Sequence, residues 1–394
     1  MSFEPIAVLA ARRTPVGAFQ GCFASVTATE LGGHAIKGAL DASGLEATDV
    51  GEVIMGCVLP AGLGQGPARQ ASLAAGIPES TPCVTLNKLC GSGMKAVMAA
   101  CDSLRNGDIE TAVAGGLESM TNAPYMLLKA RSGYRLGHGE QLLDHMFRDG
   151  LLSPWDGKPM GCFADATAAR YGFTREEQDA YAAESVRRAM AAIEGGAFVA
   201  EITPVEVAGR KGTTLIDRDE TPFTCDISKI PTMRPAFSKD GTVTAASSSS
   251  ISDGAAALVL ATGTAAASRG LKPVARILGY STHAQAPEWF TTAPVAVIDK
   301  LLAKLGWQVS DVDLFEINEA FATVTMAAIR DCGLDPAKVN VNGGACALGH
   351  PVGATGARIT TTLIHALATR GLKRGIASLC IGGGEATALA IELA

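Results

Sequence analysis

The sequence lacks paired cysteines: its ten cysteines are scattered, and no Cys-x-x-Cys motif occurs among them. Zinc sites use closely spaced cysteine and histidine pairs, so this scatter does not match a zinc pattern. Disulfide scaffolds are typical of short secreted chains, whereas this chain has 394 residues and starts without the charged and apolar segments of a secretory signal. We therefore expect a cytoplasmic, reducing environment in which most cysteines pack as small apolar residues.

An excess of basic charge and a long apolar run are also missing. Lysine and arginine number 33 against 39 aspartate and glutamate residues, and the net charge of −6 argues against a general nucleic-acid binder, which needs clustered cations. No apolar stretch reaches the roughly 18 residues that a membrane-spanning helix requires. We expect neither nucleic acid nor membrane among the partners of this chain.

Aromatic residues are few, at 5%, while glycine is abundant, with 45 residues. Glycine permits close backbone approach, so this composition indicates a tightly packed globule. The length exceeds what one ordinary domain needs. Strand-like runs alternate with helical runs over residues 1–120 and again over 271–394, which predicts an α/β fold with parallel or mixed sheets covered by helices.

The two ends of the chain contain matching segments. Residues 42–54 align without a gap on residues 304–316, and both contain a Gly-x-x-x-[Ser/Thr]-Asp-Val pattern at a predicted transition from helix to strand. Residues 114–119 similarly align on 381–386. The order of these matches indicates an ancient duplication, with chance similarity between α/β units as the alternative.

Residues 121–270 differ in character from both ends. Prolines and polar residues are frequent there, and helical periodicity is clear only around 175–193. We interpret this region as an inserted loop domain that completes the first half near its end. Insertions on a catalytic scaffold often shape the substrate entrance.

Cys90 is the first candidate for chemistry. An apolar run leads into Asn-Lys-Leu-Cys-Gly-Ser-Gly at 87–93, where small residues begin a predicted helix. A cysteine at a helix start lies near backbone N–H groups that favour its thiolate, so Cys90 is a candidate nucleophile. A buried structural cysteine beside a glycine turn is the alternative.

Three further segments supply polar groups. His350, between Gly349 and Pro351, could deprotonate a thiol, although a structural turn residue is the alternative. Cys380 ends a predicted strand before three glycines, whose amides could form an oxyanion site unless the segment is a plain turn. Asn318 is either a helix cap or an uncharged donor to a carbonyl oxygen. Together these residues form an inventory for acyl transfer with carbon-acid activation.

At these residues the sequence resembles the thiolase family, and the resemblance spans nearly the whole chain in the expected order. The motifs that carry it are Arg-Thr-Pro-Val-Gly at 13–17, Gly-Gln-Gly-Pro-Ala-Arg-Gln at 64–70, the segment around Cys90, Gly-Gly-Leu-Glu-Ser-Met at 115–120, Asn-Glu-Ala-Phe at 318–321, Gly-His-Pro-Val-Gly at 349–353 and Cys-Ile-Gly-Gly-Gly at 380–384. A single Cys-Gly-Ser-Gly would be a weak signal, whereas this ordered set is specific.

The resemblance implies two similar α/β halves, each with a five-stranded sheet, that form a five-layered α-β-α-β-α core with an inserted loop domain. It implies that Cys90 carries the acyl group, that His350 activates it, and that Cys380 exchanges the α-proton of acetyl-CoA. It further implies that Asn318 positions a water in one oxyanion hole and that the amides of Cys90 and Gly382 form the other. The implied reaction is reversible condensation of acyl-CoA units or thiolysis of 3-ketoacyl-CoA.

The resemblance also implies contacts with coenzyme A. The matching positions are Leu151, Met160, Ala236, Phe237, Ala245, Ser249, Ala320 and Phe321. The sequence departs from the family pattern at Pro159, at 246–249 and near Phe223, which leaves acyl-chain length open. Phe163 either narrows the acyl tunnel or belongs to the core of the inserted domain.

No metal or redox cofactor is implied, because the coenzyme A thioesters are substrates. A homo-oligomer, dimer or tetramer, is implied, and 127–143 is the segment that we expect at a tetramer contact unless it is a solvated loop. Two other functions stay open: a ketoacyl synthase-like condensing enzyme, which should replace Cys380 by histidine or asparagine, and a non-catalytic CoA- or lipid-binding relative, which has no need of all four polar residues. A redox-sensing pair, Cys90 and Cys380, is a third.

Overall fold

The computed structural model describes residues 4–210 and 212–394. The expected absence of a secretory signal concerns the first residues of the chain, and residues 1–3 lie outside the described residues. The first half of the fold contains β1 (Ile6–Arg13), β2 (Gly17–Ala18), α1 (Ala28–Ser43), β3 (Glu52–Gly56), α2 (Pro67–Ala74), β4 (Cys83–Leu86), α3 (Ser92–Asn106), β5 (Thr111–Ser119), β10 (Ser252–Ala261) and α6 (Gly263–Ser268). The second half contains β11 (Ala275–Ala284), α7 (Ala293–Leu305), β12 (Leu314–Ile317), α8 (Ala322–Asp331), α9 (Ala345–Leu348), α10 (Thr355–Arg370), β13 (Arg374–Ile381) and β14 (Glu385–Leu393).

The two halves mirror each other in strand order. The strands run β12-β13-β14-β11-β1-β10-β5-β3-β4, and the halves join where β1 pairs antiparallel with β11. On either side of this junction the strands occur in corresponding order, with β10 matching β14 and β5 matching β13. Among the described residues, the second half has no strand that corresponds to β4 at the outer edge of the first half. At that position Val339 forms only a single parallel bridge to Phe315 of β12. The expected five-stranded sheet is therefore complete only in the first half.

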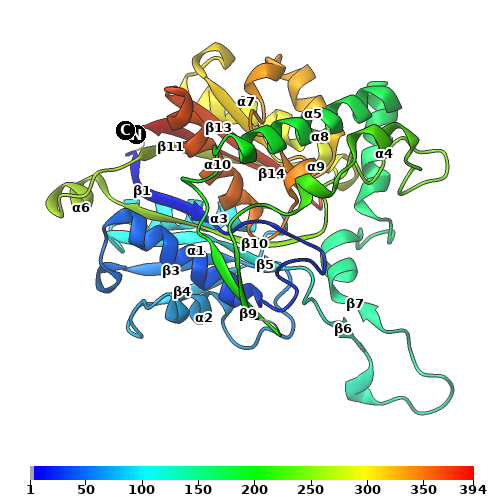
Figure 1. Ribbon diagram of the computed structural model, residues 1–394, viewed down its shortest axis with the longest axis horizontal. Helices are drawn as coiled ribbons and strands as arrows, with labels where there is room; N and C mark the ends of the chain where they lie inside the picture. The colour runs from blue at the N-terminus through cyan, green and yellow to red at the C-terminus, as the bar shows by residue number, and fades with distance from the viewer. Residues whose placement is uncertain (1–3, 211) are drawn as a thin grey trace.

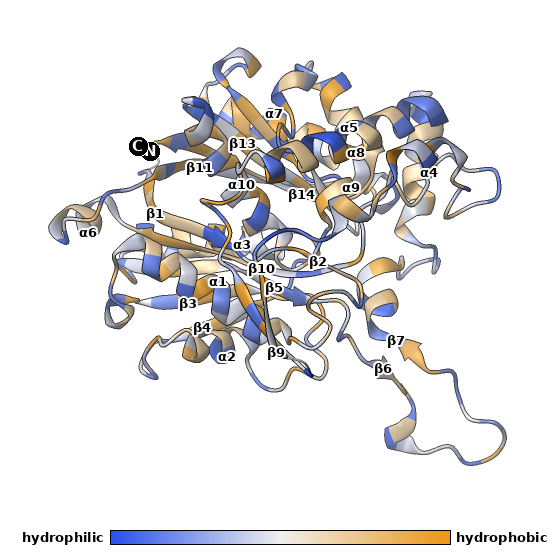
Figure 2. Cartoon of the chain, in the orientation of Figure 1, coloured by the Kyte–Doolittle hydropathy of each residue, from blue (hydrophilic) through white to orange (hydrophobic). Residues whose placement is uncertain are grey.

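Helices cover the sheets in the five layers that the resemblance implies (Figure 1). Helices α3 and α10 lie between the sheets, in one core cluster with residues from both halves. Helices α1 and α2 pack on the outer face of the first half, and α7 and α8 on that of the second. The strands β5 and β10 are buried at every residue, because helices cover both faces of the sheet. Apolar residues gather in these strands and in the packed faces of the helices (Figure 2).

The inserted region leaves the sheet after β5 and rejoins it at β10. It contains β6 (Tyr125–Met126), β7 (Leu143–Asp144), a π-helical turn (Met146–Leu151), α4 (Met160–Tyr171), α5 (Arg175–Glu194), β8 (Val205–Gly209) and β9 (Gly212–Ile216). The helical periodicity of 175–193 thus corresponds to α5. Its segment around β6 and β7 projects from the body as an arm (Figure 1).

Buried polar contacts fix the insertion to both halves. Arg13 of β1 pairs with Glu201 and Asp219 of the insertion, and all three side chains are fully buried. Tyr181 of α5 donates a hydrogen bond of 2.8 Å to Glu319 of the second half. Breaking such a buried pair is costly, because it leaves an uncompensated charge in a low-dielectric interior. The insertion therefore forms a fixed wall over the core.

The start of α3 meets the start of α10 at glycines. A Cβ atom at Gly356 would lie 2.3 Å from the backbone nitrogen of Met94, and one at Gly93 would lie 3.0 Å from the carbonyl oxygen of Gly353. No side chain fits these positions unless the helices separate. The crossing thus depends on the absence of Cβ atoms.

Gly356→Ala should lower the free energy of unfolding by about 1–3 kcal/mol, because the added methyl group overpacks the crossing. This loss should exceed the gain in helix propensity, which is about 1 kcal/mol. Urea denaturation monitored by circular dichroism measures the change. Gly263→Ala is the matched control, since nothing lies within 4 Å of its Cβ position; equal stability of both variants would contradict the packing argument.

Candidate active site

Cys90 lies in a tight turn between β4 and α3. The preceding residue, Leu89, has a positive φ of 48°, which is uncommon for a residue with a side chain. Two hydrogen bonds hold it there: its N–H donates to Asn87 Oδ1 at 2.9 Å, and Ser92 Oγ donates to its carbonyl oxygen at 2.7 Å. Such strain costs of order 1–3 kcal/mol and is typical of functional turns.

Backbone amides surround the sulfur of Cys90. The N–H of Gly382 and the N–H of Cys90 itself donate toward the sulfur and lower the pKa of the thiol, but burial is the larger effect and raises that pKa. The approach is close because Gly91 lacks a side chain: a Cβ there would lie 2.4 Å from Ile381 Cδ1. Cys90 is therefore a neutral thiol near pH 7, with two amide donors beside it.

His350 presents one free ring nitrogen. Its Nδ1 lies 2.6 Å from Thr355 Oγ1, and that hydroxyl donates its only hydrogen to the carbonyl oxygen of Pro351 at 2.9 Å. The hydroxyl must then accept from Nδ1–H, so Nε2 carries a lone pair. Within the described residues Nε2 has no hydrogen-bond partner. Burial, and secondarily the charge of Arg358, lowers the pKa of His350 to about 3, so the imidazole is neutral at physiological pH.

Asn318 and Cys380 lie at the ends of two neighbouring parallel strands. Asn318 follows β12 and its N–H donates to Ser378 of β13 at 3.0 Å, while Cys380 lies near the end of β13. Both amide atoms of Asn318 are buried without a partner among the described residues. Buried polar atoms are rarely left unpaired, so this amide is available to a water or a carbonyl oxygen.

Cys380 is 1% exposed, and it lies within electrostatic reach of Cys90. Burial raises the pKa of the Cys380 thiol well above its usual value, and a negative charge on Cys90 raises it further. The two sulfurs thus disfavour each other's ionisation. Cys380 also belongs to an apolar cluster with Phe321 and Ala320, packed against Met160 and Phe237.

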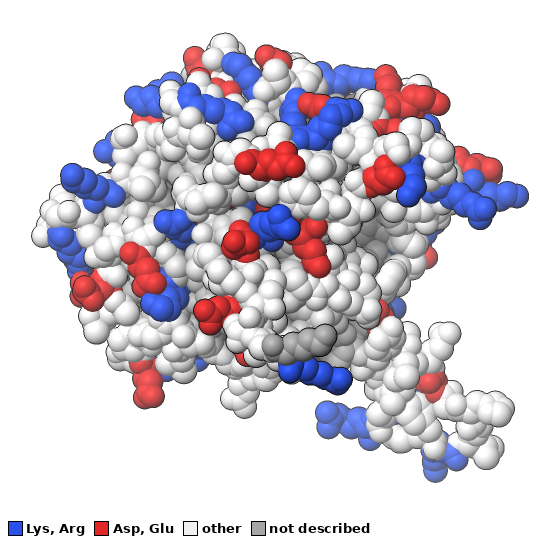
Figure 3. Space-filling view, viewed as in Figure 1, with Lys and Arg blue, Asp and Glu red and all other residues white. Residues whose placement is uncertain are grey.

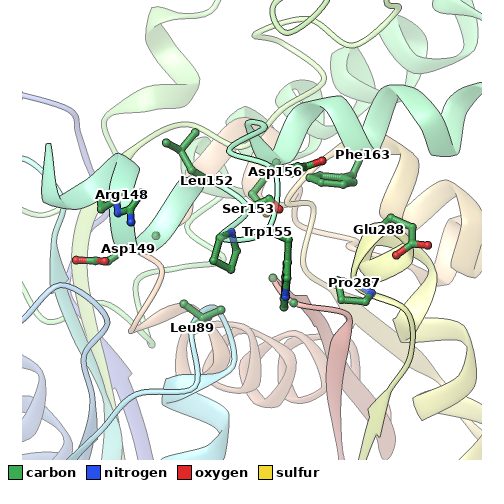
Figure 4. Close-up of a pocket in the computed structure, with 15 residues that line it drawn as sticks. Leu89, Arg148, Asp149, Leu152, Ser153, Trp155, Asp156, Phe163, Pro287 and Glu288 are labelled. Carbon is green, nitrogen blue, oxygen red and sulfur yellow. The ribbon is translucent and has the colours of Figure 1, made fainter. Parts of the chain in front are cut away.

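An open cleft of about 620 Å³ is lined by Leu89, the neighbour of Cys90, and by Gly382, whose N–H donates toward the Cys90 sulfur. Leu89, Gly382 and Gly383 line it from the two halves, and Met160, Trp155 and Phe163 line it from the insertion. Figure 4 shows Trp155 in the middle of the lining side chains, with Phe163 and Glu288 on one side and Arg148 on the other. The cleft is mainly apolar, and Arg148, Asp149, Asp156 and Glu288 are its charged lining residues.

The structure distributes the expected coenzyme A positions unevenly. Met160 lines the cleft, and Phe237 packs edge-on against Phe321 with ring centroids 5.8 Å apart. Ser249 Oγ donates to the carbonyl oxygen of Ala320 at 3.1 Å, so its side chain already has a partner. Of the eight expected positions only Met160 lines the cleft; the others include half-buried Leu151 and the exposed Ala236 and Ala245.

Several residues of the site have no role that the sequence predicts. Trp155 and Arg148 lie in a proline- and glycine-rich part of the insertion, where periodicity carries no signal. Thr355 stands in the His350 motif, but its contact depends on the turn between them. Glu118 was the most detectable, because a carboxylate in a strand of small apolar residues must have buried partners.

No group of three or more His, Cys, Asp or Glu side chains within the described residues could hold a metal ion. None of the described helices has the length and apolar character needed to cross a membrane. Figure 3 shows basic and acidic side chains interspersed on the face of the body that it displays.

Comparisons with known proteins agree with this geometry. Residues 6–264 match the thiolase N-terminal domain and residues 271–393 the thiolase C-terminal domain. The chain is 48% identical over 390 residues to the acetyl-CoA acetyltransferase of Pseudomonas aeruginosa, covering 98% of this chain and 99% of that protein. It is 49% identical to the acetyl-CoA acetyltransferase of Escherichia coli, covering 98% of both chains.

Two solved structures have the same fold. The acetyl-CoA acetyltransferase of Bacillus anthracis superposes with a TM-score of 0.97 at 42% identity and covers 100% of both chains. A thiolase of Ascaris suum in complex with coenzyme A superposes with a TM-score of 0.94 at 43% identity, covering 99% of this chain and 100% of that one. These matches extend over the whole length and both halves. The chain belongs to the thiolase family.

Proposed function

We propose that the protein is an acetyl-CoA C-acyltransferase, which cleaves 3-ketoacyl-CoA with coenzyme A or condenses acyl-CoA units in the reverse direction. The full-length relatives named acetyl-CoA acetyltransferase support this activity, and so does the thiolase solved with coenzyme A. The observation that carries the proposal is the arrangement at Cys90, where two amides donate toward one sulfur and a second thiol lies within electrostatic reach of it. A ketoacyl synthase-like site is disfavoured by the thiol at position 380.

In the first half-reaction the sulfur of Cys90 attacks the 3-keto carbon of the substrate. His350 Nε2 takes the thiol proton, which is why the neutral imidazole with a free lone pair matters. The bond between C2 and C3 then breaks, leaving the acyl group on Cys90 and a carbanion of acetyl-CoA. Cys380 protonates this carbanion, so that acetyl-CoA leaves.

In the second half-reaction the thiol of coenzyme A attacks the acyl group on Cys90. Its proton passes to the thiolate of Cys380, and the Cys90 sulfur recovers a proton from His350 as the new acyl-CoA departs. The proton count therefore closes over the cycle. Each transfer has a carrier on the chain, so the proposal needs no metal or redox cofactor.

The developing negative charges need donors. The amides of Cys90 and Gly382 would stabilise the tetrahedral oxyanion, and Asn318, through a water, would stabilise the enolate oxygen of acetyl-CoA. Loss of one such donor typically costs about 10²–10³ in rate. Once acylated, Cys90 cannot ionise, so no charge on its sulfur opposes the ionisation of Cys380 in the condensing direction.

We assign the substrate to the cleft above Gly382, with the pantetheine arm along Met160 and the cluster of Phe237, Ala320 and Phe321. Ser249, Leu151, Ala236 and Ala245 complete the proposed coenzyme A surface. We place the protein in the cytoplasm as a homo-oligomer, a dimer or a tetramer. The projecting arm supports this assembly, because Leu128, Leu136 and Leu142 are more than half exposed on it.

Cys90→Ala should abolish the acyl-enzyme, because no other thiol adjoins both amide donors. Intact mass after incubation with acetoacetyl-CoA measures the added acetyl group. Cys225→Ala is the control, since this half-buried thiol packs against a separate apolar cluster of the insertion, and the variant should label like the unmodified protein. Persistent labelling of Cys90→Ala would refute the nucleophile.

His350 should stay neutral from pH 5 to pH 8, because its pKa is lowered to about 3 and only the form below that pH is charged. Its nitrogen shifts should also show the proton on Nδ1. Protein labelled with ¹⁵N-histidine contains only six such residues, so each signal can be assigned by substitution. A His350 signal that titrates near pH 6.5 would contradict the buried, neutral base.

Thr355→Val should lower kcat by about 10²–10⁴, because the imidazole loses the acceptor that selects its tautomer. Thr355→Ser should restore most of the activity, since it keeps the hydroxyl. Steady-state thiolysis of acetoacetyl-CoA measures both variants. Equal rates for valine and serine at this position would show that the hydroxyl has no part in the reaction.

A further inference from the structure

Glu118 is a buried carboxylate that the proposed chemistry does not use. It lies on β5 and is 0% exposed. Its oxygens accept hydrogen bonds from the backbone N–H groups of Val58 at 2.9 Å, Leu59 at 3.1 Å and Gly353 at 2.9 Å, and Cys57 Sγ lies 3.8 Å away. One side chain thus binds two backbone segments from opposite halves of the fold.

The first segment leads to the nucleophile. The carbonyl oxygen of Val58 accepts a hydrogen bond of 3.2 Å from Asn87 Nδ2, and Asn87 Oδ1 accepts from the N–H of Leu89 at 2.9 Å. Leu89 is the residue with positive φ that directly precedes Cys90. A shift of Val58 would therefore be passed through two hydrogen bonds to the turn that aims the sulfur.

The second segment leads to the base. Gly353 ends the short stretch that begins with His350, and a Cβ there would lie 2.6 Å from Glu118 Oε2. The carbonyl oxygen of Gly353 packs closely against Gly116 of β5, where a Cβ would lie only 2.1 Å from it. The carboxylate therefore fits directly against the backbone that carries the imidazole.

We propose that Glu118 is a positioning residue that sets the relation between Cys90 and His350 by tying the loops of the two halves to one carboxylate. The proposal rests on the proposed function in taking Cys90 as the nucleophile and His350 as its base.

Electrostatics support a role in geometry. The pKa of Glu118 is raised to about 7, because burial outweighs the opposing effect of the hydrogen bonds from three backbone N–H groups and Cys57. When charged, Glu118 raises the pKa of Cys90, so it works against formation of the thiolate. Because its charge disfavours the thiolate, Glu118 contributes through the positions in which it holds the two loops.

The test is alkylation of Cys90 by iodoacetamide, which needs no acyl-CoA turnover. Glu118→Gln keeps the shape of the side chain but puts an NH₂ group where an acceptor is required. We expect the second-order rate of Cys90 alkylation to fall about 10- to 100-fold, the range that small misplacements of reacting groups cause. For acetoacetyl-CoA thiolysis, kcat should fall similarly while KM stays near its original value.

A double-substitution cycle separates positioning from general loosening. If Glu118 acts on the alignment of Cys90 with His350, Glu118→Gln should have little further effect once His350→Ala has removed the base. Glu220→Gln is the matched control, because the Glu220 carboxylate also accepts from two backbone amides, those of Ala18 and Cys22. In Glu220→Gln, Cys90 should be alkylated at the same rate as in the unmodified protein.

An unchanged alkylation rate in Glu118→Gln, or an equal fall in Glu220→Gln, would overturn the positioning role. If Glu118→Gln does not fold, Glu118→Asp replaces it in the same assay. Aspartate keeps the charge but is shorter by one methylene, so the alkylation rate of Cys90 should fall in the same way. Failure of the proposed function would look different: the unmodified protein would turn over no acyl-CoA, whereas the alkylation rates of the variants would still decide the role of Glu118.

Discussion

The close crossing of α3 and α10 is the contact on which the site depends. Cys90 precedes one helix and His350 precedes the other, so the distance between the helix starts constrains the distance between the proposed nucleophile and the proposed base. That distance is short because Gly93 and Gly356 present no side chains at the crossing. Close-packed interiors transmit small displacements, so even one methyl group at this crossing would reach the chemistry. Core packing and catalysis are therefore coupled in this fold.

Burial keeps the site uncharged at rest. It raises the pKa of both thiols and lowers that of the imidazole, so sulfur and nitrogen face the substrate as neutral groups. In the proposed reaction charge appears only during turnover, where the amides beside Cys90 and the amide of Asn318, which has no partner among the described residues, are already oriented. Preorganised donors in a dry site cost no rearrangement at that moment, which makes them effective. The same neutrality lets an apolar cleft reach the reacting atoms without leaving an unpaired ion at its base.

Much of this arrangement could be predicted from the sequence, because the motifs lie at element boundaries. The halves follow from alternating strand and helix patterns and from the matched segments 42–54 and 304–316. That Cys90, His350 and Cys380 should meet cannot be derived from periodicity, since it depends on tertiary packing; only the family resemblance implies it. Thr355 and Glu118 lie within motifs of the sequence, but their hydrogen-bond partners cannot be identified from it. Their roles rest on hydrogen bonds between residues far apart in the chain or across a turn.

The mirrored strand order around the junction of β1 with β11 has an evolutionary consequence. Two identical halves assembled about a twofold axis would carry the same residue before both central helices, giving two cysteines or two histidines facing each other. When the halves are joined in one polypeptide, the two positions no longer have to carry the same residue. Each copy can then diverge alone, and a symmetric scaffold comes to hold an asymmetric reaction centre.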